Sequence, residues 1–348
     1  MTRITQRYND SMRRVCLYPK AAGGGVGSFR LKFAAGLEKR GIEVSGDLKN
    51  PGEAVLVLAG TRNLPGLWGV KRRGVPIVQR LDGINWIHRR RRVSWRHTLK
   101  AEYGNLVLSY IRRYLADRIV YQSEFSRRWW EDWYGKVPAS VHVIHNGVDL
   151  EVYSVGQIGN LSGPPYKLLV VEGSLDGGYD VGLANAVGLA ETLAAKHGLP
   201  MQLTVVGQIS DSRRKSWDEK SRVPIEWLGM VPRARIPGID RSAHLLFSAD
   251  IHPACPNAVI EALACGLPVA AFDTGSLTEL VPAEAGFIAP YGGDPWKLDP
   301  PDILGLAEGA ARVLADLPRY RAGARAHAES VLGLDAMVER YMAVLFPP

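Results

Sequence analysis

The sequence predicts an α/β protein with two domains, each built on a doubly wound parallel sheet. Its 348 residues exceed what one hydrophobic core usually supports. Short β-rich apolar runs alternate with amphipathic helical segments, which is typical of parallel sheets covered by helices. A segment rich in Gly, Ser and Pro, 154–166, interrupts this alternation and separates two βαβ series. We therefore expect domains at 1–155 and 160–330.

In the first domain, we expect buried strands at 15–19, 53–59, 75–81, 117–123 and 140–146. A glycine-rich turn at 21–29 leads into an expected helix at 28–41, where Phe29, Phe33 and Leu37 recur at helical spacing. The second domain contributes strands at 167–173, 202–208, 225–231 and 268–275, with helices at 180–198 and 258–266. The end of the chain, 334–346, is an amphipathic helix.

Composition narrows the class of protein. The apolar fraction of 46% and the charged fraction of 22% argue against wholesale disorder. The three cysteines have no metal-ligand spacing and predict reduced thiols rather than a disulfide framework. The chain has no run of eighteen apolar residues and no apolar segment of a secretory signal near its start, so we expect a cytoplasmic protein.

Charge is distributed unevenly. Residues 1–155 carry 27 Lys and Arg against 13 Asp and Glu, a net charge of +14, whereas the remainder carries 16 against 22, a net charge of −6. This asymmetry indicates that the first half faces an anionic ligand or surface.

Two glycine- and amide-bearing segments are candidates for binding an anion. Gly25 and Gly27 lie between the first strand and its helix, where backbone N–H groups can approach a phosphate, although a tight turn without a ligand explains them too. Asn257 is a natural N-cap, and the N–H groups of Asn257, Ala258 and Val259 could hold a diphosphate. Glu261, one turn into this helix, could bind a ribose diol or simply favour the helix dipole.

HPACPNAVIEALACGLPVAAFDTG (252–275) resembles the donor-site motif of glycosyltransferase family 4, whose members are retaining GT-B enzymes that commonly use nucleotide sugars. HNGVD (145–149), YPKAAGGGVGSF (18–29), VVGQ (205–208) and EWLGMVP (226–232) resemble other family segments in the expected order. The resemblance implies two Rossmann-like domains facing a central cleft, with the C-terminal helix 334–348 packed back on the first domain. It implies no cofactor and no metal, with a UDP- or GDP-sugar as substrate.

The resemblance also assigns roles to residues. Glu261 would bind the ribose, Asn257 and Ala258 would lie under the diphosphate, and Gly25 and Gly27 would reach it from the opposite domain. The remaining residues expected at the donor site are Val259, the strand-end Gly207, and Gly229, Met230 and Val231 of the base pocket.

The chain departs from the family pattern at two places. Pro253 stands where a second glutamate is usual, and VEGSLDGGYD (171–180) lacks the usual Arg and Lys that neutralise the leaving diphosphate. Ser174 with Gly177 and Gly178 could form an anion-binding nest, so we expect donor binding to persist. The alternative is a degenerate protein that binds a nucleotide sugar, glycan or partner without turnover.

Asp82 and His88 are the candidate catalytic residues. Asp82 follows a strand at its carboxyl end, where open α/β sheets bind ligands, although Asp-Gly is also a common turn. His88 could orient the sugar or accept a proton from the acceptor, or it could be an ordinary surface histidine.

Arginines interleaved with tryptophan predict contact with an anionic membrane or a lipid-linked or glycan acceptor. The two clusters are Arg89–Arg92 and Trp129–Trp130. The structural alternative is a solvated loop without a partner, and single-stranded nucleic acid is a less favoured partner. Polysaccharide or glycolipid assembly is the expected setting.

Overall fold

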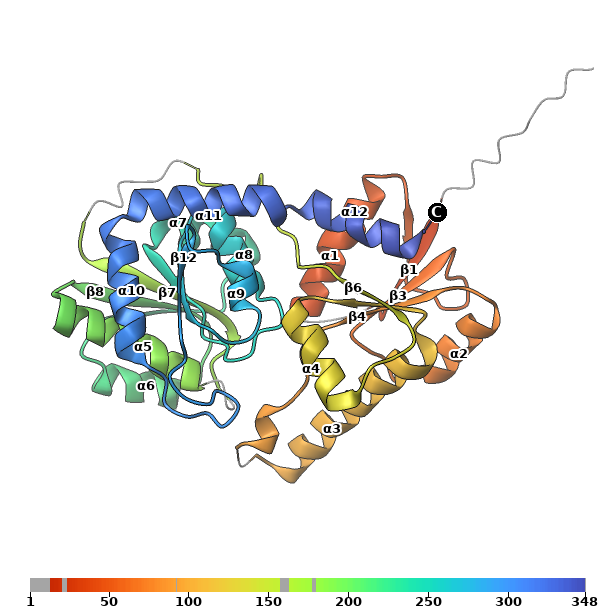
Figure 1. Ribbon diagram of the computed structural model, residues 1–348, viewed down its shortest axis with the longest axis horizontal. Coiled ribbons are helices and arrows are strands. Elements are labelled where there is room, and N and C mark those ends of the chain that lie inside the picture. The colour runs from red at the N-terminus through yellow and green to blue at the C-terminus, as the bar shows by residue number, and fades with distance from the viewer. Residues whose placement is uncertain (1–12, 21–23, 92, 157–162, 177–179, 348) are drawn as a thin grey trace, which may run out of the picture.

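The computed structural model describes residues 13–20, 24–91, 93–156, 163–176 and 180–347. Two lobes lie side by side, each built on a parallel sheet of six strands with helices on its faces (Figure 1). The predicted fold class is therefore confirmed. None of the helices in the described part of the chain combines the length and hydropathy needed to cross a membrane.

The sheet of the N-terminal lobe has the strand order β2-β1-β3-β4-β5-β6. Its strands are β1 (Arg14–Tyr18), β2 (Glu43–Ser45), β3 (Ala54–Leu58), β4 (Ile77–Leu81), β5 (Arg118–Tyr121) and β6 (Ser140–Val143). Every residue of β3 and β4 is buried, as expected for central strands covered on both faces. The strand order reverses direction between β1 and β3, which places a ligand-binding crevice outside their carboxyl ends.

The helices of this lobe are α1 (Gly24–Glu38), α2 (Leu64–Arg72), η1 (Ile87–Arg89), α3 (Trp95–Tyr110) with its continuation η2 (Ile111–Leu115), and α4 (Glu124–Tyr134). The first helix begins at Gly24, earlier than the expected start at Ser28. Gly25 and Gly27 therefore lie in its first turn rather than in a loop.

The sheet of the C-terminal lobe has the order β12-β11-β10-β7-β8-β9. Its strands are β7 (Tyr166–Ser174), β8 (Met201–Gln208), β9 (Ile225–Gly229), β10 (Leu245–Phe247), β11 (Val269–Phe272) and β12 (Gly286–Ala289). Its helices are α5 (Asp180–His197), α6 (Asp211–Lys220), η3 (Arg233–Arg235), α7 (Ile236–Ser242), α8 (Asn257–Ala264), α9 (Leu277–Leu280), α10 (Ile303–Ala315) and α11 (Leu317–Val331). Here the order reverses between β7 and β10, so these two strands mark the second crevice.

The last helix, α12 (Leu334–Leu345), crosses back to the N-terminal lobe and lies on α1 (Figure 1). The aromatic rings of Phe33 and Tyr341 pack with their centroids 5.1 Å apart. A Cβ at Gly36 would meet Val338 Cγ2 at 2.6 Å, so this glycine allows the two helices to approach closely. The packing of α12 ties the C-terminal end of the chain to the first sheet.

Asn146 and Glu279 hold the two lobes together. The Asn146 amide donates to the Cys255 carbonyl oxygen at 2.9 Å, and its oxygen accepts from the Arg80 guanidinium at 2.8 Å. Glu279 of the C-terminal lobe accepts the backbone N–H groups of Glu124 and Phe125 at 2.8 and 2.7 Å. Since these N–H groups begin α4, a carboxylate of one lobe satisfies the helix N-terminus of the other.

Candidate functional site

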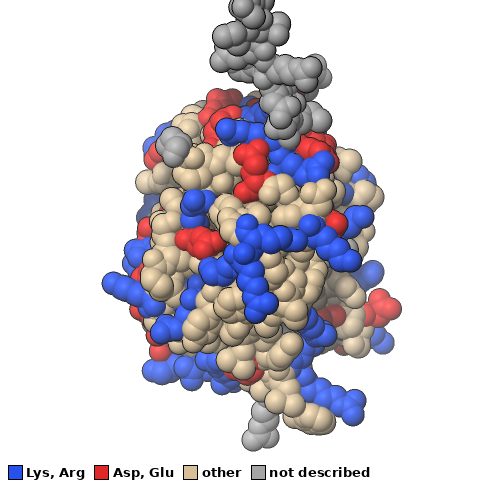
Figure 2. All heavy atoms as spheres, turned by 90° about the vertical axis from the view of Figure 1, so that its right-hand side faces the viewer, with Lys and Arg blue, Asp and Glu red and all other residues tan. Residues whose placement is uncertain are grey.

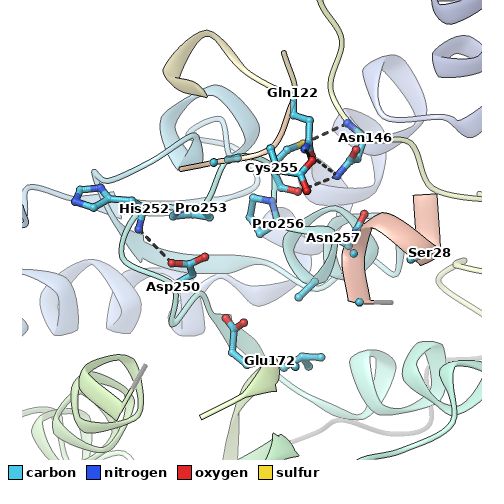
Figure 3. Close-up of a pocket in the computed structure, with 18 of the residues that line it drawn as sticks. Ser28, Gln122, Asn146, Glu172, Asp250, His252, Pro253, Cys255, Pro256 and Asn257 are labelled. Atoms are coloured by element: carbon cyan, nitrogen blue, oxygen red, sulfur yellow. Dashed lines mark hydrogen bonds between the residues drawn. The ribbon is translucent and has the colours of Figure 1, made fainter. Parts of the chain in front are cut away.

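A cleft of ≈ 690 Å³ lies between the lobes, where the starts of α1 and α8 come together (Figure 3). A Cβ at Gly25 would stand 3.8 Å from Asn257 Nδ2. The strand-order reversals of both sheets open onto this cleft, because residues after β1, β4, β7 and β10 line it. Two positive helix ends thus face one space, which favours an anionic ligand.

The start of α8 is arranged differently from the sequence expectation. Pro256, not Asn257, is the N-cap residue, and no side chain caps the helix. The first N–H groups of a helix have no intrahelical partner, so those of Asn257 and Ala258 remain for a ligand. Both residues line the cleft.

Glu261 is buried but borders the cleft, with its carboxylate held by two cations. Its Oε1 accepts from Lys32 Nζ at 2.9 Å and from the Arg233 guanidinium at 3.0 Å. Lys32 belongs to α1 of the opposite lobe. Burial lowers the pKa of Lys32, and the charge of Glu261 counters that shift. The carboxylate therefore does more than favour a helix dipole, because it forms an ion pair that spans the two lobes.

Two further carboxyl groups lie at the reversal point of the second sheet. Glu172 is at the end of β7, and Asp250 follows β10 (Figure 3). Burial, assisted by the charge of Asp250, raises the pKa of Glu172 to about 8. Burial also raises the pKa of Asp250. This acidic pair borders the region where the family pattern places a basic pair.

Asp82 lies in the cleft beside the buried Arg80. The Arg80 guanidinium donates to Asp82 Oδ1 at 2.8 Å and lies 4.0 Å from the ring centroid of Phe29. Gln122 Nε2 donates to the same carboxylate oxygen. Both donors contact the same oxygen, so the other carboxylate oxygen remains to accept a hydrogen bond from a ligand hydroxyl group.

His88 is buried at the wall of the cleft, not exposed on the surface. Its Nε2 lies 2.8 Å from Glu102 Oε1. Hydrogen bonds from Arg89 and then from His88 lower the pKa of Glu102 to about 2, so this carboxylate is a permanent acceptor. The other ring nitrogen, Nδ1, is buried and has no partner among the described residues.

Eight of the predicted site residues line the cleft: Gly25, Asp82, His88, Met230, Val231, Asn257, Ala258 and Glu261. Five others that the structure describes do not: Gly27, Ser174, Gly207, Gly229 and Val259.

The positions of these five residues have structural reasons. Val259 is fully buried in the core below α8. A Cβ at Gly207 would meet the Glu172 carbonyl oxygen at 2.4 Å, so this glycine permits close approach of β7 and β8 rather than of a ligand. Gly229 ends β9 with a φ of +62°. Ser174 accepts a hydrogen bond from the backbone N–H of Asp176 at 3.3 Å, and the nest expected at Gly177 and Gly178 lies outside the described residues.

The predicted membrane contact through Trp129 and Trp130 is wrong. Trp129 is 4% exposed and Trp130 is fully buried, because both pack in a hydrophobic cluster of the N-terminal lobe. The indole N–H of Trp130 donates to the Asp82 carbonyl oxygen at 2.8 Å.

The arginines of the predicted contact are only partly available. Arg89 binds Glu102 and stacks on Trp133, and Arg91 pairs with Asp180. Arg90 is exposed, and Arg92 lies outside the described residues.

Several residues that line the cleft, or that bind a lining residue, were not expected from the sequence. Lys32, Arg233 and the pair Glu172–Asp250 gain their roles through contacts between distant segments, for which the sequence gives no local signal. His252 also lines the cleft and stacks on Trp296 with ring centroids 3.7 Å apart. Burial lowers its pKa to about 4, so the ring is neutral at physiological pH.

Comparisons with known proteins agree with this architecture. Residues 56–152 match "Glycosyltransferase Family 4", and residues 173–316 match "Glycosyl transferases group 1". No match was found among curated protein sequences.

Solved structures with the same fold share little sequence with the chain. The sucrose-phosphate synthase of Thermosynechococcus elongatus is 16% identical with a TM-score of 0.70, over 95% of this chain and 98% of that one. HepE of Anabaena, solved with UDP, is 16% identical with a TM-score of 0.70, over 96% of this chain and 99% of that one. WaaG, a glycosyltransferase of lipopolysaccharide biosynthesis, is 16% identical with a TM-score of 0.67, over 97% of this chain and 100% of that one.

The two family matches fall on the two lobes in chain order, and the solved structures have the GT-B fold over nearly the whole chain. The chain thus belongs to the group 1 glycosyltransferases of family 4.

Proposed function

We propose that this protein transfers a glycosyl group from a nucleoside diphosphate sugar to an acceptor bound by the N-terminal lobe. The proposal rests mainly on one observation: the starts of α1 and α8 face each other across the cleft, with no side-chain cap on α8 and with Glu261 one turn inside it. Helix N–H groups suit a diphosphate, and a carboxylate at this depth suits the two hydroxyl groups of a ribose. A UDP- or GDP-sugar fits this arrangement. UDP and UDP-glucose bind to HepE, which has the same fold.

Charge in the cleft supports binding of a diphosphate despite the missing basic pair. Arg80 neutralises Asp82, while Lys32 and Arg233 neutralise Glu261. Because the pKa of Glu172 is raised to about 8, that carboxyl group is largely protonated at neutral pH. Arg233 and Lys32 are the cations nearest the ribose-binding end, so binding of the ribose to Glu261 would release them towards the phosphates.

The reaction we propose proceeds with retention and without a metal. The bond between the anomeric carbon and the diphosphate oxygen breaks, and its electron pair goes to the diphosphate. The acceptor oxygen bonds to the same face of that carbon, and its proton passes to the departing diphosphate. Asp82 and His88, which line the cleft, would hold the sugar in position.

The acidic pair favours one alternative, a protein that binds its ligand without turnover. Glu172 and Asp250 border the position where a departing diphosphate gains charge, and the negative charge that Asp250 contributes to this pair would oppose the reaction. Pro253 also removes the second glutamate of the family motif.

Two measurements separate these functions. Thermal unfolding with UDP, GDP and their sugars tests donor binding, since a ligand at a hundred times its dissociation constant stabilises the folded state by about 2.7 kcal/mol. Release of nucleoside diphosphate from the sugar that binds then tests turnover. Stabilisation with slow release supports the transferase, and stabilisation without release supports the binding protein. If none of the nucleotides stabilises the protein, both proposals fail.

A further inference from the structure

A second cavity, of ≈ 430 Å³, lies in the N-terminal lobe next to the donor cleft. It is enclosed by the segment after β3 and by one side of α3. Asn85 and His97 line both spaces, so the cavity adjoins the cleft. The Asn85 side chain is held in place by the buried Asn105, whose Oδ1 it contacts at 3.1 Å. A group bound in the second cavity would therefore lie within reach of the bound sugar.

The cavity is cationic. Arg62, Lys100 and His97 line it, and its lining contains no Asp or Glu. Within the described parts of the chain, neither Arg62 nor Lys100 has a carboxylate partner, which contrasts with Arg89 and Arg91 nearby. The Arg62 guanidinium instead lies 5.6 Å from the ring centroid of Tyr103.

The turn that leads from β3 into the cavity wall has an unusual conformation. Ala59, at the end of β3, has a φ of +60°, a left-handed conformation that an alanine adopts only at some cost. The residue is fixed there by two hydrogen bonds: its N–H donates to the Arg80 carbonyl oxygen at 2.8 Å, and its carbonyl accepts from Gln79 at 2.8 Å. This turn directs the next residues, Gly60 to Arg62, around the cavity.

Large apolar side chains run along α3 beside the cavity. Trp95, Leu99, Tyr103 and Leu106 are 67%, 60%, 49% and 61% exposed. Their spacing places them on one side of the helix, so α3 directs its apolar stripe outwards, with Arg96 and Lys100 along its edge. Tyr103 belongs to both the stripe and the cavity.

The surroundings of the stripe are basic. Figure 2 looks onto the end of the N-terminal lobe, where Lys and Arg side chains outnumber Asp and Glu over the middle and lower parts of the face. Helix α3 lies at the lower part of the molecule (Figure 1). An apolar stripe with unpaired cations beside it complements a molecule that has both a hydrocarbon portion and an anionic head.

We propose that this cavity is the acceptor subsite and that it binds the phosphate of a lipid-borne acceptor, whose hydrocarbon chain lies along the stripe of α3. This inference rests on the proposed transfer reaction, because it assigns the acceptor of that reaction. Arg62 and Lys100 bind the phosphate, and the wall formed by Asn85 and His97 places the acceptor next to the donor sugar. The proposed surface is on α3, whereas the sequence predicted contact through Arg89–Arg92 and Trp129–Trp130.

The test is sedimentation with vesicles of phosphatidylcholine, alone or with phosphatidic acid as the phosphate-bearing probe. The parent protein is expected to bind only the mixed vesicles. Arg62→Gln with Lys100→Gln should weaken this binding about thirtyfold, since each basic group near an anionic surface contributes a factor of roughly five. Leu99→Ser with Leu106→Ser should weaken it at least about tenfold through lost apolar burial.

The matched control is Arg214→Gln with Lys215→Gln on α6, which removes the same charge from the other lobe and should bind like the parent. Equal binding of both vesicles, or a loss in the control equal to that in the cavity variant, would overturn the proposal. The proposal would also fail if the parent protein does not bind vesicles and is instead a dimer that dissociates in the Leu99/Leu106 variant. The stripe would then contact a second copy of the chain. If inorganic phosphate inhibits vesicle binding as strongly as dispersed phosphatidic acid does, the cavity binds free phosphate and the proposed lipid is wrong.

Binding of the nucleotide is measured on the same variants. Unchanged nucleotide binding in all of these variants, together with loss of vesicle binding in the cavity and stripe variants, supports the acceptor subsite. Vesicle binding without any nucleotide binding would instead refute the donor site and leave the cationic cavity as a lipid-binding site only.

Discussion

Replacing Glu261 by glutamine separates its two roles, as partner of Lys32 and as proposed ligand of the ribose. The substitution keeps the shape of the side chain and removes its charge. Glu261 and Lys32 have side chains that are only 8% and 12% exposed, so their ion pair is shielded from solvent. Arg233 is 41% exposed, and its pair with the same oxygen contributes less.

The structure gives the expected magnitudes. Complete removal of one partner from a buried ion pair costs about 3–5 kcal/mol, and glutamine retains an acceptor oxygen, so we expect a loss of about 3 kcal/mol in unfolding free energy. A hydrogen bond to a charged group exceeds a neutral one by about 1 kcal/mol. Two ribose hydroxyl groups then account for about 2 kcal/mol, or a roughly thirtyfold weaker affinity for the nucleotide.

Calorimetric titration with the nucleoside diphosphate that stabilises the parent measures the second effect, and denaturant unfolding measures the first. Glu279→Gln is the matched control, because Glu279 is also a half-buried carboxylate between the lobes but does not line the cleft. It should lose stability and keep nucleotide affinity. Unchanged affinity in Glu261→Gln, or an equal loss of affinity in both variants, would refute the assignment of Glu261.

Three other substitutions have defined outcomes. The pKa of Glu172 is raised to about 8, so this carboxyl group gains negative charge as pH rises through 8. Affinity for the diphosphate should therefore fall in binding titrations between pH 6 and pH 9. Glu172→Gln should flatten this pH profile. Gly207→Ala should lower the unfolding free energy by more than about 1 kcal/mol in denaturant melts, because its Cβ would meet a carbonyl oxygen at 2.4 Å with φ at +145°. Trp130→Phe leaves the carbonyl oxygen of Asp82 without its donor and should cost about 1–3 kcal/mol by the same assay, whereas a membrane-facing tryptophan would tolerate the change.

Local sequence patterns were sufficient for the fold. Strand β3 is a continuous apolar run, and α8 is a mainly apolar helix that is followed by Gly266, so short-range spacing predicts both. The start of α1 was misplaced, since its glycines suggested a loop although the helix already includes them. Asn257 was expected as the N-cap because of its type, and Pro256 occupies that position instead.

The site was predictable only where one segment supplies it. Asn257, Ala258 and Glu261 share α8, and all three line the cleft. Lys32 and Glu261 are 229 positions apart in the chain, so their ion pair depends on how the lobes dock.

The burial of Trp129 and Trp130 could not be predicted from an Arg-Trp pattern either. That pattern is the same for an exposed face as for a buried face of α4, and the packing of α4 against the sheet decides between them.

The contacts of Glu279 make the separation of the two lobes measurable by hydrogen exchange. The amide protons of Glu124 and Phe125 are bonded to it only while the lobes are docked, so each separation exposes them to solvent. Their rate of deuterium uptake therefore records how often the cleft opens, whatever molecule occupies it. A substrate that keeps the lobes together would slow that uptake from a position outside the cleft.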